Sequence, residues 1–368
     1  MGRSISLWTI GPSTLAVLLC AIAQPPVPAV GETIQLAYKT GSVASRVFTP
    51  AKSKFGGKPF QIRGEQGTLQ VGGQAALFGV RYSQATKAFY GALDTDGDGQ
   101  LGPREYVKFD PTMSASYNIK LGEDDYAVRL ANVRISQRGV GGPVTGITGG
   151  YVINSCYMGT YAGLGVRLFD DNLDGQFTQD GKDAIAVGRS MFAIPLGKTH
   201  QIGKSHYDLE VSADGKQVTL TPVSGLELGV VEVAFRRGMQ CLALYSEDGD
   251  RSYDLAASAK TGIPAGSYRL TYGVLTAGKM STVLKPTDKA PVYEIEAGKI
   301  NTLRLGPPLM VGFHANFSNG MVTVSPNVQV FGSGGEEYSF DYSGGTGRPH
   351  VLMLEGKRQI MDKAMEYG

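Results

Sequence analysis

From about residue 205 onward, apolar and polar residues alternate with a period of two, and this feature constrains the fold more than any other. The segment "HYDLEVSADGKQVTLTP" places Asp214-Gly215 between two alternating runs, and "NFSNGMVTV" places Asn319-Gly320 in the same position. Such pairs adopt the positive-φ conformations that two-residue β-hairpin turns require. The alternation continues toward the C-terminus at Val322, Val324, Val328, Val330, Tyr338, Phe340 and Tyr342. The C-terminal half is therefore predicted to be antiparallel β, arranged as β-sandwiches.

The composition suits a fold of many short strands. The chain has 368 residues and 51 glycines, which is about twice the usual glycine share of roughly 7% and favours tight turns. The length indicates two or three domains, each able to bury a hydrophobic core. The formal net charge is only +2, and no run of Lys or Arg alternates with aromatic residues. A nucleic acid is therefore not expected as a partner.

The segment "IPAGSYRLTYGVL", residues 263–275, contains a Pro-x-Gly-x-Tyr-x-Leu turn and strand. It resembles the β-sandwich modules of the transthyretin-like and carboxypeptidase-regulatory-like families, although a general β-turn leading into a strand would give the same residues. The resemblance implies a spacer or adhesive module over residues 201–290, without an active site of its own. Residues 291–368 are expected to form a second small sandwich with an immunoglobulin-like character.

The segment "DTDGDGQLGPRE", residues 94–105, concentrates negative charge in a chain whose total charge is almost balanced. Carboxylates this close repel each other, so without a counter-ion the segment should stay extended or take up protons. A cation bound among them would remove the repulsion.

This spacing resembles the EF-hand calcium loop, D-x-[DN]-x-[DN]-G-x5-E, at every required position. The resemblance implies Ca²⁺ as the cofactor, held by the side chains of Asp94, Asp96 and Asp98, the backbone carbonyl of Gln100 and both carboxylate oxygens of Glu105. Gly99 would permit the sharp turn around the ion, and Leu101 would point into a core. A solvated acidic turn is the alternative.

The residues on either side of this loop predict short helices. Ala85, Ala88, Phe89, Ala92 and Leu93 have helical spacing after Ser83, which is suited to an N-cap. On the exit side Pro103 can start a helix, but Pro111 would end it after about two turns. We therefore expect a small α component within an α+β calcium-loop domain over residues 32–200. The short exit helix departs from the usual pair of helices and argues against cooperative calcium sensing.

A second acidic segment, "DDNLDGQFTQDGKD", covers residues 170–183 and repeats the spacing in part. It offers Asp170, Asn172, Asp174 and the backbone of Gln176 as calcium ligands. Its twelfth position is Gly181, which has no side chain, so either Asp180 or Asp183 would have to close the site. Because the preceding "LGVRLF" alternates like a strand, the segment resembles the strand-loop-helix variant of the DxDxDG calcium loops. A structural turn rich in Asp and Asn is the alternative.

The N-terminal sequence "MGRSISLWTIGPSTLAVLLCAIAQ" is typical of a cleavable secretory signal peptide over residues 1–23, followed by a Pro-rich spacer over residues 24–31. A membrane anchor would need roughly 20 apolar residues, more than this run supplies. A lipoprotein site at Cys20 is a further alternative, but Leu19 is bulkier than the lipobox pattern accepts. No later stretch is long and apolar enough to cross a membrane. Because the signal peptide directs export, the mature chain is expected to be extracytoplasmic: secreted, periplasmic or at the cell surface. There Cys156 and Cys241 would either pair or remain buried thiols.

Sequence motifs for common hydrolases are absent: the chain contains no H-E-x-x-H and no G-x-S-x-G, and its four histidines are scattered. The sequence therefore predicts a non-enzymatic, exported calcium-binding protein with a structural or adhesive role and a cell-surface or matrix partner. An exported hydrolase with structural calcium sites, whose catalytic residues come from distant parts of the chain, remains the alternative.

Overall fold

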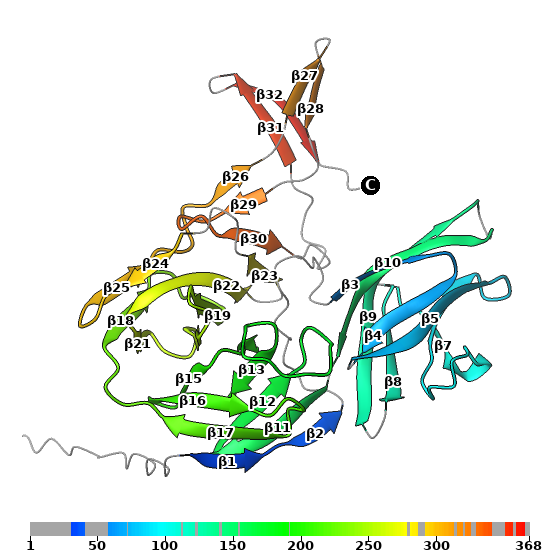
Figure 1. Ribbon diagram of the computed structural model, residues 1–368. Coiled ribbons are helices and arrows are strands. Elements are labelled where there is room, and N and C mark those ends of the chain that lie inside the picture. The colour runs from blue at the N-terminus through cyan, green and yellow to red at the C-terminus, as the bar shows by residue number, and fades with distance from the viewer. Residues whose placement is uncertain are drawn as a thin grey trace, which may run out of the picture.

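The fold is seen in a computed structural model of the chain (Figure 1). The structure describes residues 31–40, 58–340 and 350–364, apart from residues 72, 112, 122–123, 140–141, 154, 191, 278–279, 286–290, 313–314, 319–320, 325–328 and 356–357. The predicted signal peptide and the spacer up to residue 30 lie outside the described residues.

The regular secondary structure of the described residues is almost entirely β-strand, which confirms the mainly β class. Their one helical element is the 3-10 turn Pro103–Glu105. In this part of the chain, no helix has the length and apolar character that crossing a membrane requires.

The helix expected between Ser83 and Leu93 is a β-hairpin, in which β5 (Gln74–Ser83) pairs antiparallel with β6 (Ala88–Leu93). The Ser83 hydroxyl accepts a hydrogen bond from the Thr86 N–H at 3.4 Å, as an N-cap would. The chain nevertheless reverses at Lys87, whose φ is 51°. Cross-strand pairing and the burial of Leu93 therefore override the helical spacing. The expected α component, and with it the α+β character of the N-terminal domain, is wrong for the described residues.

Residues 58–153 form what we call the N-terminal unit, in which two antiparallel four-stranded sheets enclose one hydrophobic core. The sheet orders are β3–β10–β9–β8 and β4–β5–β6–β7. The strands besides β5 and β6 are β3 (Lys58–Arg63), β4 (Gln66–Val71), β7 (Tyr106–Lys108), β8 (Ala115–Leu121), β9 (Asp124–Gln137) and β10 (Val144–Ile153). Figure 1 shows this unit in blue and cyan, to one side of the remaining strands.

Residues 155–222, together with β1 and β2, form what we call the central unit, built around a second core. One five-stranded sheet has the order β14–β13–β12–β11–β2, and β1–β17–β16–β15 begin a 12-stranded sheet. The strands are β1 (Glu32–Gln35), β2 (Ala37–Thr40), β11 (Ser155–Tyr161), β12 (Leu164–Phe169), β13 (Ala184–Val187), β14 (Ile194–Pro195), β15 (Thr199–Ile202), β16 (Ser205–Val211) and β17 (Gln217–Pro222). The predicted boundary between residues 200 and 201 lies within β15, and the core takes residues from both sides of it. Independent folding of the two sides stays a prediction.

The remaining strands continue the 12-stranded sheet as β20–β19–β22–β23–β30–β29–β26, with β24 also paired to β22, over a third core. A three-stranded sheet, β21–β18–β25, and two separate hairpins complete the fold. The strands are β18 (Leu228–Val233), β19 (Met239–Ser246), β20 (Arg251–Asp254), β21 (Lys260–Pro264), β22 (Gly266–Ala277), β23 (Met280–Lys285), β24 (Tyr293–Ile295), β25 (Ile300–Leu303), β26 (Met310–Gly312), β27 (Ala315–Ser318), β28 (Met321–Val324), β29 (Gln329–Phe331), β30 (Glu337–Phe340), β31 (His350–Glu355) and β32 (Arg358–Ala364).

The hairpin predicted from Asp214-Gly215 is confirmed by the antiparallel pair β16–β17. β27 and β28, on either side of Asn319-Gly320, also pair antiparallel, while that turn itself lies outside the described residues. Gly215 has the positive φ, 69°, that its turn requires. The strands are not antiparallel throughout, because β15 pairs parallel to β20 and β18 parallel to β25. Cys156 and Cys241 are both buried in the central core as free thiols.

Candidate metal centre

The first acidic loop joins β6 to β7 at one end of the N-terminal unit. Two backbone hydrogen bonds fix its entrance, from Asp94 N to the Leu77 carbonyl at 2.8 Å and from Lys120 N to the Thr95 carbonyl at 3.2 Å. Leu101 lies against Gly79, where an added Cβ would come within 2.6 Å of the leucine Cδ1. The sequence placed Leu101 toward a core, and the structure directs it onto β5 of this unit.

Backbone N–H groups of the loop itself orient the three aspartates. The Asp94 carboxylate accepts from Gly97 N at 2.8 Å and from Gly99 N at 3.0 Å. Asp96 accepts from Asp98 N at 3.3 Å, and Asp98 accepts from Gln100 N at 2.7 Å. Asp94 is buried, whereas Asp96 and Asp98 are exposed. One carboxylate oxygen from each of the three lies within 4.8 Å of the others, so their oxygens converge on a space that would suit a cation.

Glu105 ends the first loop and is also buried. One of its carboxylate oxygens accepts from the Thr95 N–H and from the Thr95 hydroxyl at 2.8 Å. The other accepts from Gly102 N at 2.7 Å. These contacts bring the glutamate back to the start of the loop, but it is not one of the three residues whose oxygens converge. Coordination by Glu105 and by the Gln100 carbonyl stays a prediction.

The second acidic loop joins β12 to β13 in the central unit, so the predicted strand before it is confirmed and the predicted helix after it is wrong. Strand pairing explains the difference, because Ala184–Val187 pairs with both β12 and β14 in the buried sheet. The Asp170 carboxylate accepts from Asp174 N at 3.1 Å and from Gly175 N at 2.9 Å.

The two loops share three side-chain to backbone hydrogen bonds at equivalent positions and differ in one, because Asp94 accepts from Gly97 N at position four and Asp170 from Asp174 N at position five. In the second loop Asn172 accepts from Asp174 N at 2.9 Å, and Asp174 accepts from Gln176 N at 2.8 Å. These bonds correspond to those of Asp96 and Asp98 in the first loop, residue for residue. The second loop therefore adopts the folded form of the first, although its sequence departs from the EF-hand spacing after position six.

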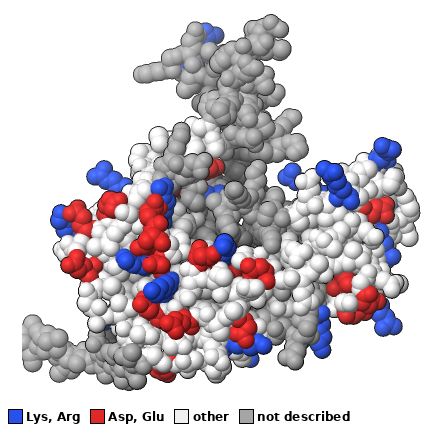
Figure 2. Space-filling view, viewed as in Figure 1, with Lys and Arg blue, Asp and Glu red and all other residues white. Residues whose placement is uncertain are grey.

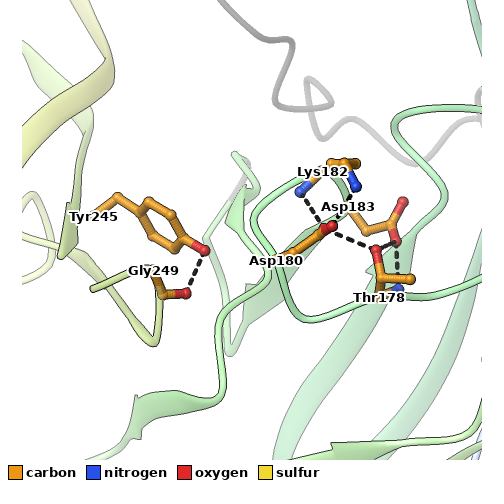
Figure 3. Close-up of polar contacts among 6 residues, drawn as sticks. All are labelled: Thr178, Asp180, Lys182, Asp183, Tyr245 and Gly249. Atoms are coloured by element: carbon orange, nitrogen blue, oxygen red, sulfur yellow. Dashed lines mark hydrogen bonds and ion pairs between the residues drawn. The ribbon is translucent and has the colours of Figure 1, made fainter. Parts of the chain in front are cut away.

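The structure distinguishes the two acids that could close the second loop. Asp183 accepts from Thr178 N at 2.7 Å, which corresponds to the bond from Gly102 N to Glu105. Asp180 instead accepts from the Thr178 hydroxyl at 2.8 Å and forms an ion pair with Lys182 (Figure 3). Asp183 thus occupies the position of Glu105, two residues later in the loop than the EF-hand pattern places it. As metal ligands, both acids stay predictions.

Gly181 makes this two-residue insertion possible. Its φ is 76°, and an added Cβ would lie 2.8 Å from the ring of Tyr245. The Tyr245 hydroxyl donates to the Gly249 carbonyl (Figure 3). The end of the second loop is therefore packed against β19 and the turn that follows it.

Asp171 is the residue of this site that sequence reasoning missed. It is buried, and its Oδ2 has no hydrogen-bond partner among the described residues, as is also true of Asp183 Oδ1. Burial raises the pKa of Asp171, and the charges of Asp183 and Asp170 raise it further. The only sequence signal for Asp171 is the adjacent acidic pair Asp170-Asp171. The EF-hand pattern does not point to Asp171, because the second position of that loop carries no ligand.

Burial also dominates the electrostatics of Asp183 and Asp170. It raises the pKa of Asp183 to about 7 and that of Asp170 to about 6, although backbone N–H groups lower both values in part. Buried carboxylates without a positive partner favour their neutral form. The second loop thus holds a concentration of buried acid that a cation would neutralise.

A small recess borders the second loop where the central and N-terminal units meet. Its volume of about 20 Å³ has room for one or two water molecules. Its lining residues are Tyr38, Tyr126, Ser155, Cys156, Tyr157, Leu168, Asp170, Gly175, Phe177 and Asp214. Water in this recess would reach the Asp170 carboxyl.

The buried histidines of the central unit have structural surroundings. His200 Nε2 lies 3.0 Å from both the backbone N and the carbonyl O of Gly197, and burial lowers its pKa to about 4. Burial also lowers the pKa of His206. Both rings therefore favour the neutral form at neutral pH.

Over the described residues on the face shown in Figure 2, Lys and Arg side chains are interspersed with Asp and Glu.

Comparison of the chain with models of known protein families, with curated proteins and with solved structures finds no match. The fold and the loops thus define an all-β protein with two glycine-containing acidic loops of shared backbone form.

Proposed function

We propose that this chain is an exported calcium-binding protein with a structural or adhesive role, and that Ca²⁺ stabilises the units that carry the two acidic loops. The observation that carries the proposal is the convergence of oxygens from Asp94, Asp96 and Asp98 within 4.8 Å. Three carboxylates at this spacing repel each other, and a bound divalent cation turns that repulsion into attraction.

The donor set favours calcium over other cations. All side-chain donors in the two loops are oxygens, which suit hard cations rather than zinc or copper. Magnesium requires near-ideal octahedral geometry, whereas calcium accepts six to eight oxygens in irregular arrangements such as a loop supplies. In the first loop the proposed ligands are Asp94, Asp96, Asp98, the Gln100 carbonyl and Glu105.

In the second loop the proposed ligands are Asp170, Asn172, Asp174 and the Gln176 carbonyl, with Asp183 as the closing acid. The shared hydrogen-bond pattern of the loops and the position of Asp183 support this assignment. Asp180 is the weaker choice, because its carboxylate already pairs with Lys182.

The cellular setting and the C-terminal modules belong to the same proposal. Export through the signal peptide would place the chain where calcium is abundant, so sites with dissociation constants of about 0.1 to 1 mM would be filled and would act as braces rather than switches. The strands after residue 201 would form transthyretin-like and immunoglobulin-like sandwiches that present a surface to a cell-surface or matrix partner.

Calorimetric titration of the full mature chain with CaCl₂ and with MgCl₂ tests the proposal. We expect two calcium sites, of which Asp98→Asn weakens one and Asp174→Asn weakens the other. Asp250→Asn is the matched control, because it removes one negative charge from an exposed turn outside both loops. Absence of calcium uptake at millimolar ion, or equal effects of all three variants, would show that the acidic loops are only turns.

A further inference from the structure

The second acidic loop lies between two hydrophobic cores and contributes one side chain to each. Leu173 is buried in the core of the N-terminal unit, although the loop belongs by its strands to the central unit. Phe177, four residues later, is buried in the core of the central unit. The segment between them, which contains the proposed ligands Asp174 and Gln176, therefore connects the two units.

The contact with the N-terminal unit is close and specific. Gly73 N donates to the Leu173 carbonyl at 3.3 Å. A Cβ added to Gly73 would lie 2.4 Å from the Asp174 carbonyl oxygen, and the φ of Gly73 is 76°. Leu173 has a φ of 62°, a left-handed conformation that a residue with a branched side chain adopts only where its surroundings fix it. Burial of Leu173 in the other unit's core supplies that constraint.

The contact with the central unit is equally well defined. Phe177 N donates to the Ala213 carbonyl at 2.9 Å, and Gly181 N donates to the Leu196 carbonyl at 3.1 Å. The Phe177 ring packs edge-on against Tyr157, with centroids 5.6 Å apart. This side of the loop is held by β11, by the β16–β17 turn and by the segment before β15.

Two buried carboxyl groups flank this anchored segment in the sequence, and each has an oxygen that lacks a partner among the described residues, Asp171 Oδ2 and Asp183 Oδ1. The exposed fraction of the residue is 6% for Asp171 and 0% for Asp183. Buried acids without a positive partner favour either their neutral form or the uptake of a cation that neutralises them.

We propose that a cation in the second loop ties the N-terminal unit to the central unit, and that a cation in the first loop acts only within the N-terminal unit. The inference rests on the proposed calcium binding and adds a distinct role for the second site. All anchors of the first loop, Leu77, Gly79 and Lys120, belong to the N-terminal unit. Filling the second loop draws Asp170, Asp174 and Asp183 together, and this movement fixes Leu173 and Phe177 relative to each other.

Spin labels on the two units test the tie in the full mature chain. Thr68→Cys on β4 and Lys204→Cys in the β15–β16 turn provide exposed attachment points, and the native thiols are buried. Double electron–electron resonance then gives the label–label distance distribution with EDTA and with saturating CaCl₂. In the chain that carries only the two labels, we expect calcium to reduce the width of the label–label distance distribution by a factor of at least about two.

The variants Asp98→Asn and Asp174→Asn form a matched pair, because each residue is at position five of its loop and caps the N–H of a glutamine at 2.7 and 2.8 Å. We expect Asp98→Asn to retain the calcium-dependent narrowing and Asp174→Asn to lose it. Leu173→Ala removes the anchor but no proposed ligand, so it should still take up calcium in the second loop and yet lose the narrowing. Circular dichroism of each variant checks that it is folded, and Leu173→Ala supplies the test if Asp174→Asn is not.

Two results would overturn the inference. If calorimetry shows both sites filled while the distance distribution does not respond, calcium binding stands and the tie is wrong. Narrowing that persists in Asp174→Asn or Leu173→Ala would lead to the same conclusion. If calorimetry finds no calcium in the second loop, the proposed function fails for that loop and the tie fails with it.

Discussion

Replacing Asp94 should separate the structural role of this carboxylate from its role as a calcium ligand. Asp94 is 6% exposed and accepts two backbone hydrogen bonds, from Gly97 and Gly99. In EDTA, Asp94→Ala loses both bonds to a charged acceptor and gains some relief from the repulsion of Asp96 and Asp98. The expected net loss is about 2 to 3 kcal/mol of unfolding free energy.

Calcium adds a second, separable contribution. With a dissociation constant of about 0.1 mM and about 1 mM free ion, one filled site stabilises the folded chain by RT ln(1 + 10), about 1.4 kcal/mol. Asp94→Ala should remove this contribution from calcium. The unfolding free energy lost on the substitution should therefore be about 1.4 kcal/mol larger in calcium than in EDTA.

Urea unfolding of the full chain and of Asp94→Ala, each in EDTA and in 1 mM CaCl₂, measures both contributions. Asp110→Ala is the control, because Asp110 also accepts a backbone N–H, from Ser114 at 2.9 Å, in the same unit but outside the loop. The unfolding free energy lost in Asp110→Ala should be equal in EDTA and in 1 mM CaCl₂. An Asp94→Ala cost that is also equal in the two media would refute calcium binding by the first loop.

Three further predictions concern other parts of the chain. His200 has a pKa of about 4 in the folded chain against an ordinary 6.5, so the stability that depends on its neutral ring is complete above pH 6.5 and is lost as the pH falls toward 4. Urea unfolding should therefore show about 3 kcal/mol of acid sensitivity that His200→Gln removes. Equal pH profiles of the unchanged chain and the variant would contradict this. Gly73→Ala should lower the unfolding free energy by about 2 kcal/mol or more, because the new Cβ would lie 2.4 Å from the Asp174 carbonyl oxygen at a residue whose φ is 76°. An unchanged denaturation midpoint would show that the contact between Gly73 and the second loop adjusts without loss of stability. N-terminal sequencing of the exported protein should begin at Gln24, and a chain that retains Met1 or carries lipid on Cys20 would exclude the signal-peptide prediction.

The strand content of this fold was accessible from the sequence where local signals are strong. Alternation and a turn-forming pair such as Asp214-Gly215 specify a hairpin without help from the rest of the chain. Around residues 83–93 the signal is ambiguous, because apolar residues at 88, 89, 92 and 93 fit one face of a helix and also a buried strand. Pairing of β6 with β5 and β7 decides the outcome, and such pairing is a property of the tertiary structure.

The acidic loops show the same limit at the level of the site. The spacing of Asp94, Asp96 and Asp98 predicted residues that the structure does bring together. The choice between Asp180 and Asp183 depended on which acid meets the Thr178 N–H, and no spacing rule decides that. Asp171 was missed because its importance comes from its burial, which local sequence does not encode.

A comparison of the second position in the two loops shows that the loops differ in how their buried acids are hydrogen-bonded. In the first loop this position is Thr95, whose hydroxyl donates to the closing Glu105 at 2.8 Å. In the second loop it is Asp171, which as a carboxylate offers no proton to the closing Asp183, and both acids retain a buried oxygen without a partner among the described residues. The first loop is therefore satisfied internally and exposes two of its aspartates to water, which screens their charges. The second loop buries Asp171 and Asp183, where charge is costly unless it is neutralised. The buried acids of the first loop thus have partners for their oxygens, whereas two buried oxygens of the second have none among the described residues; if the proposed calcium binding holds, we expect the second loop to depend more strongly on its ion.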